Sequence, residues 1–168
     1  MGDLRSEMAA LWASPLRDRR PCRGRWSRRV RRMNADDVNV MLAEHFPGAG
    51  ANCVELGGTY AVASTELSEL SIRPGGYVSG PTQFAIADAA LWYVTFVAIG
   101  RIEPMALTSE LSIRFLRPAQ GERIWARADL ATATRRSVVG SVSVWMDDRS
   151  DRPTAVAQGT YVLPRAKD

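Results

Sequence analysis

The stretch that decides the fold is Ser79-Gly80-Pro81-Thr82-Gln83-Phe84-Ala85-Ile86-Ala87-Asp88, a glycine turn that opens a long apolar helix. From Phe84 to Ile99 the residues are apolar on every side, and only Asp88 and Thr95 interrupt them. A helix that is hydrophobic all round lies in a core. A carboxylate is almost never buried without a partner, because removing it from water is costly. Asp88 is therefore the first candidate functional residue.

The start of the same helix offers a second chemical feature. Gly80 allows close backbone approach, and Pro81 suits the first helical position, where its missing N–H costs nothing. Free amide groups at a helix start polarise a carbonyl or stabilise an oxyanion. Gly80 and Asp88 lie ~12 Å apart along the axis, so one carbonyl cannot touch both within one helix. Two copies that run antiparallel in a dimer would bring Gly80 of one subunit to Asp88 of the other.

Length and composition predict one globular domain with an appendage. The 168 residues suffice for one well-filled core and not for two ordinary domains, and 46% of them are hydrophobic and 24% charged. The longest apolar run has 16 residues and an internal Asp, and it falls short of the ~20 that span a bilayer. Cys22 and Cys53 lie far apart without metal-ligand spacing. We therefore expect free thiols, a reducing cytoplasm and no membrane span.

The basic charge of the chain belongs to residues 1–33, which hold ten arginines against three acidic residues. This segment carries a charge of +7, and the total of +4 therefore leaves −3 for residues 34–168. Prolines and a glycine interrupt it, so we expect either a disordered tail or an artefactual extension, with translation starting at Met33. An arm that binds nucleic acid or anionic lipid stays open as a third possibility. No nucleic-acid partner is expected of the core.

The rest of the chain alternates between helical and strand patterns. An N-cap at Asn34 with acids in the next turn predicts a short amphipathic helix that ends before Pro47-Gly48. His45 lies near the end of that helix, where a positive charge is favoured, and we expect it to be structural. Apolar residues then recur at strand spacing in six segments, two before the long helix and four after it: 51–56, 59–66, 107–115, 124–130, 138–146 and 155–163.

This order of elements favours an α+β fold. The compact arrangement is an antiparallel sheet of about five to six strands wrapped around one long buried central helix. Over roughly residues 34–164 the chain resembles the hotdog-fold acyl-CoA thioesterases of the phenylacetate-degradation, or PaaI-like, type. The resemblance rests on three segments taken together: Gly76 to Pro81 continuing through Ala87-Asp88-Ala89, Leu111 to Ala119, and Ala157 to Tyr161.

The resemblance implies roles for residues of the opening stretch. In that family an Asp or Glu on the helix acts as nucleophile or general base, and this acid falls on Asp88. The first family glycine, whose amide binds the thioester oxygen, falls on Gly80. Ser79 replaces the family histidine and Pro81 the second glycine, so the chain is a Ser-Gly-Pro variant of a His-Gly-Gly opening. No metal or cofactor is implied, because a carboxylate and an amide donor can suffice for an activated thioester.

Further candidate substrate-binding positions lie outside that stretch. A water-orienting side chain of the family falls on Arg73, and a family Ser or Thr on the strand after the helix falls on Thr108. Trp92, one turn beyond Asp88, is a candidate wall of the acyl pocket, although core packing explains it equally. Arginine forks suit phosphate groups, so the candidates for binding the CoA phosphates, unless they are only solvated, are Arg117, Arg135 and Arg136.

The implied reaction is hydrolysis of an acyl-CoA to a carboxylic acid and CoA, in a cytoplasmic homodimer that pairs into a dimer of dimers. The alternative is a non-catalytic acyl-CoA binding or sensing protein, which loss of the family histidine favours and retention of Asp88 disfavours. A hotdog dehydratase would need a histidine near the acid, and the only histidine is His45. For Asp88, a salt bridge to a buried arginine or a hydrogen bond to the facing helix stays open as a purely structural role.

Overall fold

The computed structural model describes residues 33–68 and 71–165. The predictions made for the arginine-rich segment fall on residues 1–32, outside the described residues, and so does Cys22. The boundary between a tail and a core domain beginning at residue 34 therefore stays a prediction.

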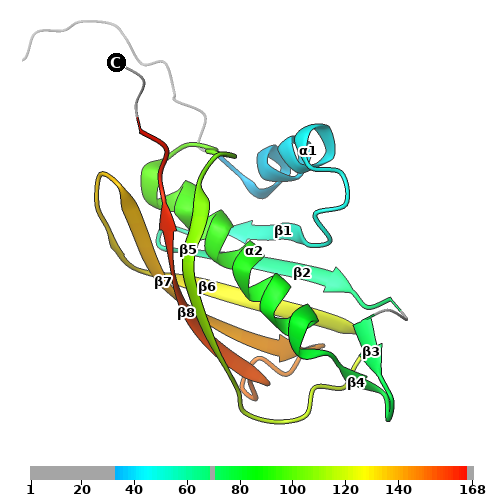
Figure 1. Cartoon of the computed structure of the whole chain (residues 1–168). Coiled ribbons are helices and arrows are strands. Elements are labelled where there is room, and N and C mark those ends of the chain that lie inside the picture. The colour runs from blue at the N-terminus through cyan, green and yellow to red at the C-terminus, as the bar shows by residue number, and fades with distance from the viewer. Residues whose placement is uncertain (1–32, 69–70, 166–168) are drawn as a thin grey trace, which may run out of the picture. The chain divides into compact units, whose positions relative to one another are not determined.

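The described chain forms a six-stranded antiparallel sheet with one long helix across its face (Figure 1). The sheet order is β1-β2-β6-β7-β8-β5, and a separate two-stranded ladder pairs β3 with β4. The predicted sheet wrapped around a central helix is thus confirmed. The elements in chain order are α1 (Ala35–His45), β1 (Asn52–Leu56), β2 (Tyr60–Glu66), β3 (Ile72–Arg73), β4 (Tyr77–Val78), α2 (Gly80–Ile99), β5 (Leu107–Phe115), β6 (Arg123–Ala133), β7 (Ser137–Met146) and β8 (Ala155–Val162).

Helix α1 begins where the sequence predicts. The Asn34 side chain accepts a hydrogen bond from the Asp37 amide at 2.9 Å, and the Asp37 carboxylate accepts one from the Asn34 amide at 3.0 Å. This reciprocal pair is a capping box, which satisfies two amides at the helix start. The apolar face of α1 packs on the core through Val38, Met41 and Leu42, while Phe46, just past the last turn, is 54% exposed.

Helix α2 begins at Gly80, one residue before Pro81. Ser79 is the N-cap, and its hydroxyl accepts a hydrogen bond from the Thr82 amide at 3.2 Å. Gly80 is therefore the first helical residue and Pro81 the second, so the prediction that Pro81 takes the first position was off by one. The helix ends at Ile99 and is capped by Gly100, whose φ of 71° is the left-handed conformation that glycine adopts at little cost.

A pair of glycines in the sheet makes room for α2. Gly140 on β7 and Gly159 on β8 are directly paired, and both face Leu91 of the helix. A Cβ atom at either glycine would lie 2.7 Å from a methyl group of Leu91. At Gly159 it would also lie 2.6 Å from the backbone oxygen of Glu110. Only glycine at these two positions leaves enough space for the Leu91 side chain of the helix to pack against the sheet.

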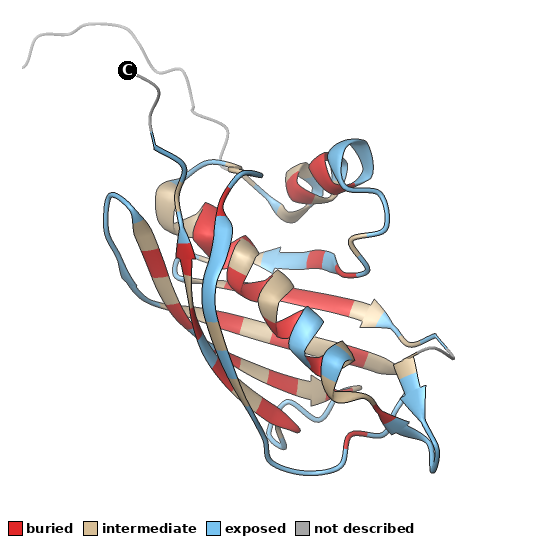
Figure 2. Ribbon diagram, viewed as in Figure 1, coloured by how far each residue is buried: buried red, intermediate tan, exposed pale blue. Residues whose placement is uncertain are grey.

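The helix is not buried on every side, contrary to its uniformly apolar sequence. The face of α2 toward the sheet is buried, whereas Phe84 and Ala85 are exposed and Asp88, Ala89 and Trp92 are half-buried (Figure 2). By length and composition the 20-residue α2 could cross a membrane, but half of the apolar window lies inside this fold. Such a helix is the central helix of a core, with one face left open in the single chain.

Strand β5 also departs from its expected pattern. The alternation of apolar and polar residues predicts a buried face, yet Leu107 and Phe115 are 62% and 50% exposed, and Leu111 and Ile113 are half-buried. Strand β5 lies at the edge of the sheet, bonded to β8 on one side only. Strand β5 runs beside α2 (Figure 1), and its outer edge pairs with no other strand of the described residues.

We predict that Gly159→Ala lowers the free energy of unfolding by about 3 kcal/mol, the upper range for overpacking a core, because the facing atom is backbone and cannot rotate away. Thermal unfolding followed by circular dichroism measures the effect. Gly58→Ala is the matched control, since a Cβ there meets nothing within 4 Å. Equal melting temperatures for the two variants would contradict the packing described for Leu91.

Candidate active site

The Asp88 carboxylate is held by two hydroxyl groups from neighbouring strands. Its Oδ1 atom accepts hydrogen bonds from Thr108 Oγ1 at 2.8 Å and from the Tyr161 hydroxyl at 2.9 Å. Thr108 on β5 and Tyr161 on β8 are directly paired residues, so their side chains reach the helix together. The register shifts between Thr108 and Glu110, which marks a bulge at the site.

Both hydroxyls bind the same oxygen of Asp88. Within residues 33–68 and 71–165, no side chain donates a hydrogen bond to Oδ2, and no arginine pairs with the carboxylate. The salt bridge to a buried arginine that the sequence left open is thus not formed in the described chain. One oxygen is fixed by the protein, and the other is available to a ligand or a water molecule.

Tyr161 is a member of this site that the sequence did not single out. Its ring is buried, and burial, followed by the charge of Asp88, raises the pKa of the Tyr161 hydroxyl well above its usual range. The group therefore stays protonated and remains a donor. A buried tyrosine usually finds a hydrogen-bond partner, and this was the signal that could have linked Tyr161, on the inward face of its strand, to an acid.

Asp88 opens onto a cleft of about 670 Å³ between α1, α2 and the segment before β5. The cleft is mainly apolar, and its walls comprise Met41, His45, Phe46, Trp92, Pro104, Met105, Ala106 and Leu107, with Thr108 and Tyr161 beside the carboxylate. Largely apolar clefts with a few converging polar groups are typical of small-molecule sites. The sequence assigned His45 a structural role, and the structure places it at the rim of this cleft, with a largely exposed ring.

Trp92 lines the cleft and also packs in the core. Its ring contacts Phe46 and Phe96 edge to face, with centroid distances of 6.3 and 5.2 Å. Its Nε1 atom is buried and finds no acceptor in the part of the chain that the structure describes. Both interpretations offered by the sequence, a pocket wall and a core residue, therefore fit the position of Trp92.

Gly80 is the first residue of α2, whereas the cleft-lining residues Asp88 and Trp92 lie in the middle of the helix. The ring of Phe115 covers it so closely that a Cβ atom at Gly80 would lie 3.3 Å from Phe115 Cζ. Among the described residues none accepts a hydrogen bond from the Gly80 amide. The Ser79 hydroxyl is occupied by the cap, with Thr82 Oγ1 at 2.7 Å. Within one chain, Gly80, Ser79 and Pro81 are therefore separated from Asp88.

Arg73 also belongs to the Gly80 end. It lies on β3, paired with Tyr77 of β4, in the small hairpin that directly precedes α2. None of the six strand segments predicted from the sequence includes this hairpin. The hairpin turns through Gly75 and Gly76, with φ values of 91° and 75°. The exposed Arg73 side chain thus lies with the helix start and not with Asp88 of the same chain.

The three arginines predicted to bind CoA phosphates do not come together in one chain. Arg117 follows β5, beside the start of β8, where its amide meets the Thr154 carbonyl. Arg136 lies in the turn before β7, where its carbonyl accepts a hydrogen bond from Leu163, just past the end of β8. Arg135 precedes it in the same turn. The length of β8, ~26 Å at ~3.3 Å per residue, separates the two positions.

Across residues 33–68 and 71–165, no group of three or more His, Cys, Asp or Glu side chains could hold a metal ion. The charged and polar groups of the cleft are instead one carboxylate, two hydroxyls and an imidazole. Such a set is suited to acid–base or nucleophilic chemistry at a carbonyl group.

The fold is shared with solved structures of thioesterases. A provisionally assigned thioesterase from a Silicibacter species is 27% identical, with a TM-score of 0.70 over 79% of this chain and 93% of that one. A thioesterase from Haemophilus influenzae is 15% identical, with a TM-score of 0.65 over 79% and 92%. The E. coli PaaI protein of the phenylacetic acid degradation operon is 18% identical, with a TM-score of 0.64 over 79% and 94%.

Sequence comparison points to the same group. No curated protein matches the chain. The model of the Thioesterase superfamily matches residues 75–151, a span that includes Gly80, Asp88, Thr108 and Arg117. The chain therefore has the hotdog fold of these thioesterases, and from the β3–β4 hairpin to the loop before β8 its sequence matches the Thioesterase superfamily.

Proposed function

We propose that this protein hydrolyses the thioester bond of an acyl-CoA, releasing a carboxylic acid and CoA. The observation that carries the proposal is the Asp88 carboxylate, held on one oxygen by two hydroxyls and open to an apolar cleft on the other. The match of residues 75–151 to the Thioesterase superfamily supports the choice of a thioester over other carbonyl compounds.

Asp88 acts on the thioester carbonyl through its second oxygen. As a general base it takes a proton from water, the resulting hydroxide adds to the carbonyl carbon, and the C–S bond breaks as the thiol of CoA leaves with a proton. As a nucleophile it adds to the carbonyl carbon, the C–S bond breaks and CoA leaves as a thiolate that takes up a proton, and water then cleaves the mixed anhydride to the carboxylic acid and the free Asp88 carboxylate. In either route Thr108 and Tyr161 keep Oδ1 in place, so they act as positioning residues.

The negative charge that develops on the carbonyl oxygen needs a donor, and the Gly80 amide is the proposed one. It stands at the positive end of the helix dipole and lacks an acceptor among the described residues. Because Gly80 and Asp88 are ~12 Å apart along α2, the amide has to come from a second copy of the chain. Catalysis therefore requires a homodimer with two equivalent sites.

Two features of the single chain support such a dimer. The open face of α2 is apolar and carries Ala85 and Ala89, whose small side chains let a second helix approach closely. Beside it, the edge strand β5 presents free backbone groups along with exposed Leu107 and Phe115. Exposed apolar edges are the places where sheets pair with another chain. Pairing of dimers into a tetramer stays a prediction, as does a cytoplasmic location.

The remaining candidate residues lie around the proposed site, which combines Asp88 of one subunit with Gly80 of the other. Trp92 walls the acyl group inside the cleft, and Thr108 holds the carboxylate. Arg73, in the hairpin next to Gly80, reaches the partner's cleft together with the oxyanion donor, where it faces the attacking water. Ser79 and Pro81 shape the helix start and contribute no catalytic group, because the Ser79 hydroxyl is committed to its cap.

We predict that the purified protein releases free thiol from at least one member of a panel of short, medium, long and aryl acyl-CoAs. Asp88→Asn should lower kcat by a factor of about 100 or more, the usual contribution of a general base. Asp129→Asn is the control, because Asp129 pairs with Arg127 away from the cleft. Absence of turnover across the panel with intact acyl-CoA binding would instead support the non-catalytic binding protein.

Tyr161→Phe should lower kcat by a factor of about 10 to 100, because a carboxylate displaced by a fraction of an ångström reacts more slowly, while KM changes little. Tyr60→Phe removes a matched hydroxyl that also binds a carboxylate, that of Glu55, and neither residue lines the cleft. Steady-state kinetics of both variants, with melting temperatures as a check on folding, compare them. Equal kcat values would exclude a positioning role for Tyr161.

A further inference from the structure

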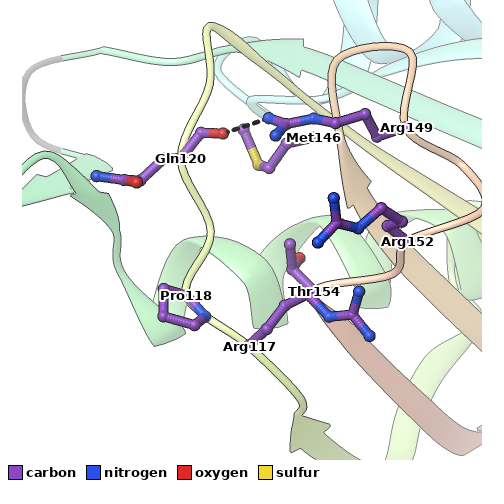
Figure 3. Close-up of a pocket in the computed structure, with 7 residues that line it drawn as sticks. All are labelled: Arg117, Pro118, Gln120, Met146, Arg149, Arg152 and Thr154. Atoms are coloured by element: carbon purple, nitrogen blue, oxygen red, sulfur yellow. Dashed lines mark hydrogen bonds between the residues drawn. The ribbon is translucent and has the colours of Figure 1, made fainter.

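Three arginines surround a recess that the proposed chemistry does not use. The recess has a volume of about 100 Å³ and lies between the β5–β6 loop (residues 116–122) and the β7–β8 loop (147–154) (Figure 3). Its lining contains Arg117, Arg149 and Arg152, together with Gln120 and Thr154, and includes no carboxylate. The space corresponds to about three water molecules in the liquid, which suits one phosphate group.

The recess is built by hydrogen bonds between the two loops. The amides of Leu116 and Arg117 donate to the Thr154 carbonyl at 2.8 and 3.4 Å. Arg149 Nη2 donates to the Gln120 carbonyl at 2.7 Å, a bond drawn in Figure 3.

Asp147 closes the same junction. It accepts hydrogen bonds from the amides of Glu122 and Arg123, and these bonds hold the pKa of its carboxyl below the usual value. The two loops that carry the arginines are therefore held together by hydrogen bonds.

The charges around the recess are not balanced. Arg149 pairs with Asp147 at 3.3 Å. Arg117 and Arg152 form no ion pair with any residue in 33–68 or 71–165, although all three arginines line one small space. Like charges repel, and an anion placed among them relieves the repulsion. Guanidinium forks bind phosphate oxygens in pairs, so a phosphate is the anion that this geometry suits best.

The recess lies beside the start of α2. Thr154 Oγ1 donates to Gln83 Oε1 at 2.9 Å, and Gln83 is in the first turn of that helix. Phe115, which precedes the β5–β6 loop, covers Gly80. The arginines therefore belong to the same end of the molecule as the amide that is proposed to bind the thioester oxygen.

We propose that the recess formed by Arg117, Arg149 and Arg152 binds a phosphate group of the CoA part of the substrate. The inference rests on the proposed function, and it assigns the binding of CoA to a site that includes two residues not singled out by the sequence. The thioester sulfur and the phosphates of CoA are joined by a flexible arm. With the thioester at Gly80, that arm leads along the helix start to the recess of the same subunit.

The test compares acyl-CoA with the matching acyl-pantetheine, which has the same thioester and no phosphate. Arg117→Ala and Arg152→Ala should each raise KM for acyl-CoA by a factor of about ten, the value of a charge-assisted hydrogen bond. They should leave kcat and the hydrolysis of acyl-pantetheine unchanged. Arg101→Ala is the control, because Arg101 follows the far end of α2 and pairs with Glu103.

Calorimetric titration with free CoA and with inorganic phosphate separates this proposal from the proposed function. Loss of CoA affinity in both recess variants, with wild-type melting temperatures, supports the recess even if no thioester is hydrolysed. CoA affinity equal to that of wild type overturns it, even if the protein is an active thioesterase. Loss of inorganic phosphate binding alone also overturns it, because the recess would then be a site for free phosphate.

Discussion

A carboxylate on an otherwise apolar helix is the constraint on which the rest of the structure depends. The Asp88 carboxylate can be partly buried in the cleft because the hydroxyl groups of Thr108 and Tyr161, on two neighbouring strands, donate hydrogen bonds to it. These two hydrogen bonds require β5 and β8 to pair in the register that places Thr108 opposite Tyr161. They also require α2 to lie close to the sheet, which the glycine pair beneath Leu91 allows. The site is therefore a product of the same packing that forms the core.

The helix also divides the proposed chemistry between its two ends. Its start supplies an amide, a dipole and a neighbouring group of arginines, and its middle supplies the carboxylate and the apolar cleft. Because a helix is rigid, these parts cannot meet within one chain. The open face of α2 and the free edge of β5 provide the surface through which a second chain can join them. In the proposed mechanism, catalysis therefore depends on assembly of the dimer.

Much of this could be predicted from local patterns, and the remainder depends on contacts between distant segments. Strand periodicity and the cap at Asn34 predict the elements, and an apolar helix with one acid marks Asp88 as a candidate functional residue. A buried tyrosine signals a need for a hydrogen-bond partner, but the sequence did not identify Asp88 as the partner of Tyr161, because the two are 73 residues apart and periodicity carries no register between strands. The prediction of a buried face on strand β5 was wrong. Alternation of apolar and polar residues shows that one face of a strand is apolar, but it does not show whether another element covers that face. The arginine recess arises where two loops meet, so spacing in sequence could not reveal it.

The most direct measurement is complementation between two inactive variants. Asp88→Asn removes the carboxylate, and Gly80→Pro removes the amide hydrogen. Each variant alone should be inactive, with a folded and dimeric state verified by circular dichroism and native mass spectrometry. If the site is shared, random mixing yields heterodimers with one intact site each, and about a quarter of wild-type thioesterase activity returns. Heterodimers that form and stay inactive would contradict a site shared between subunits.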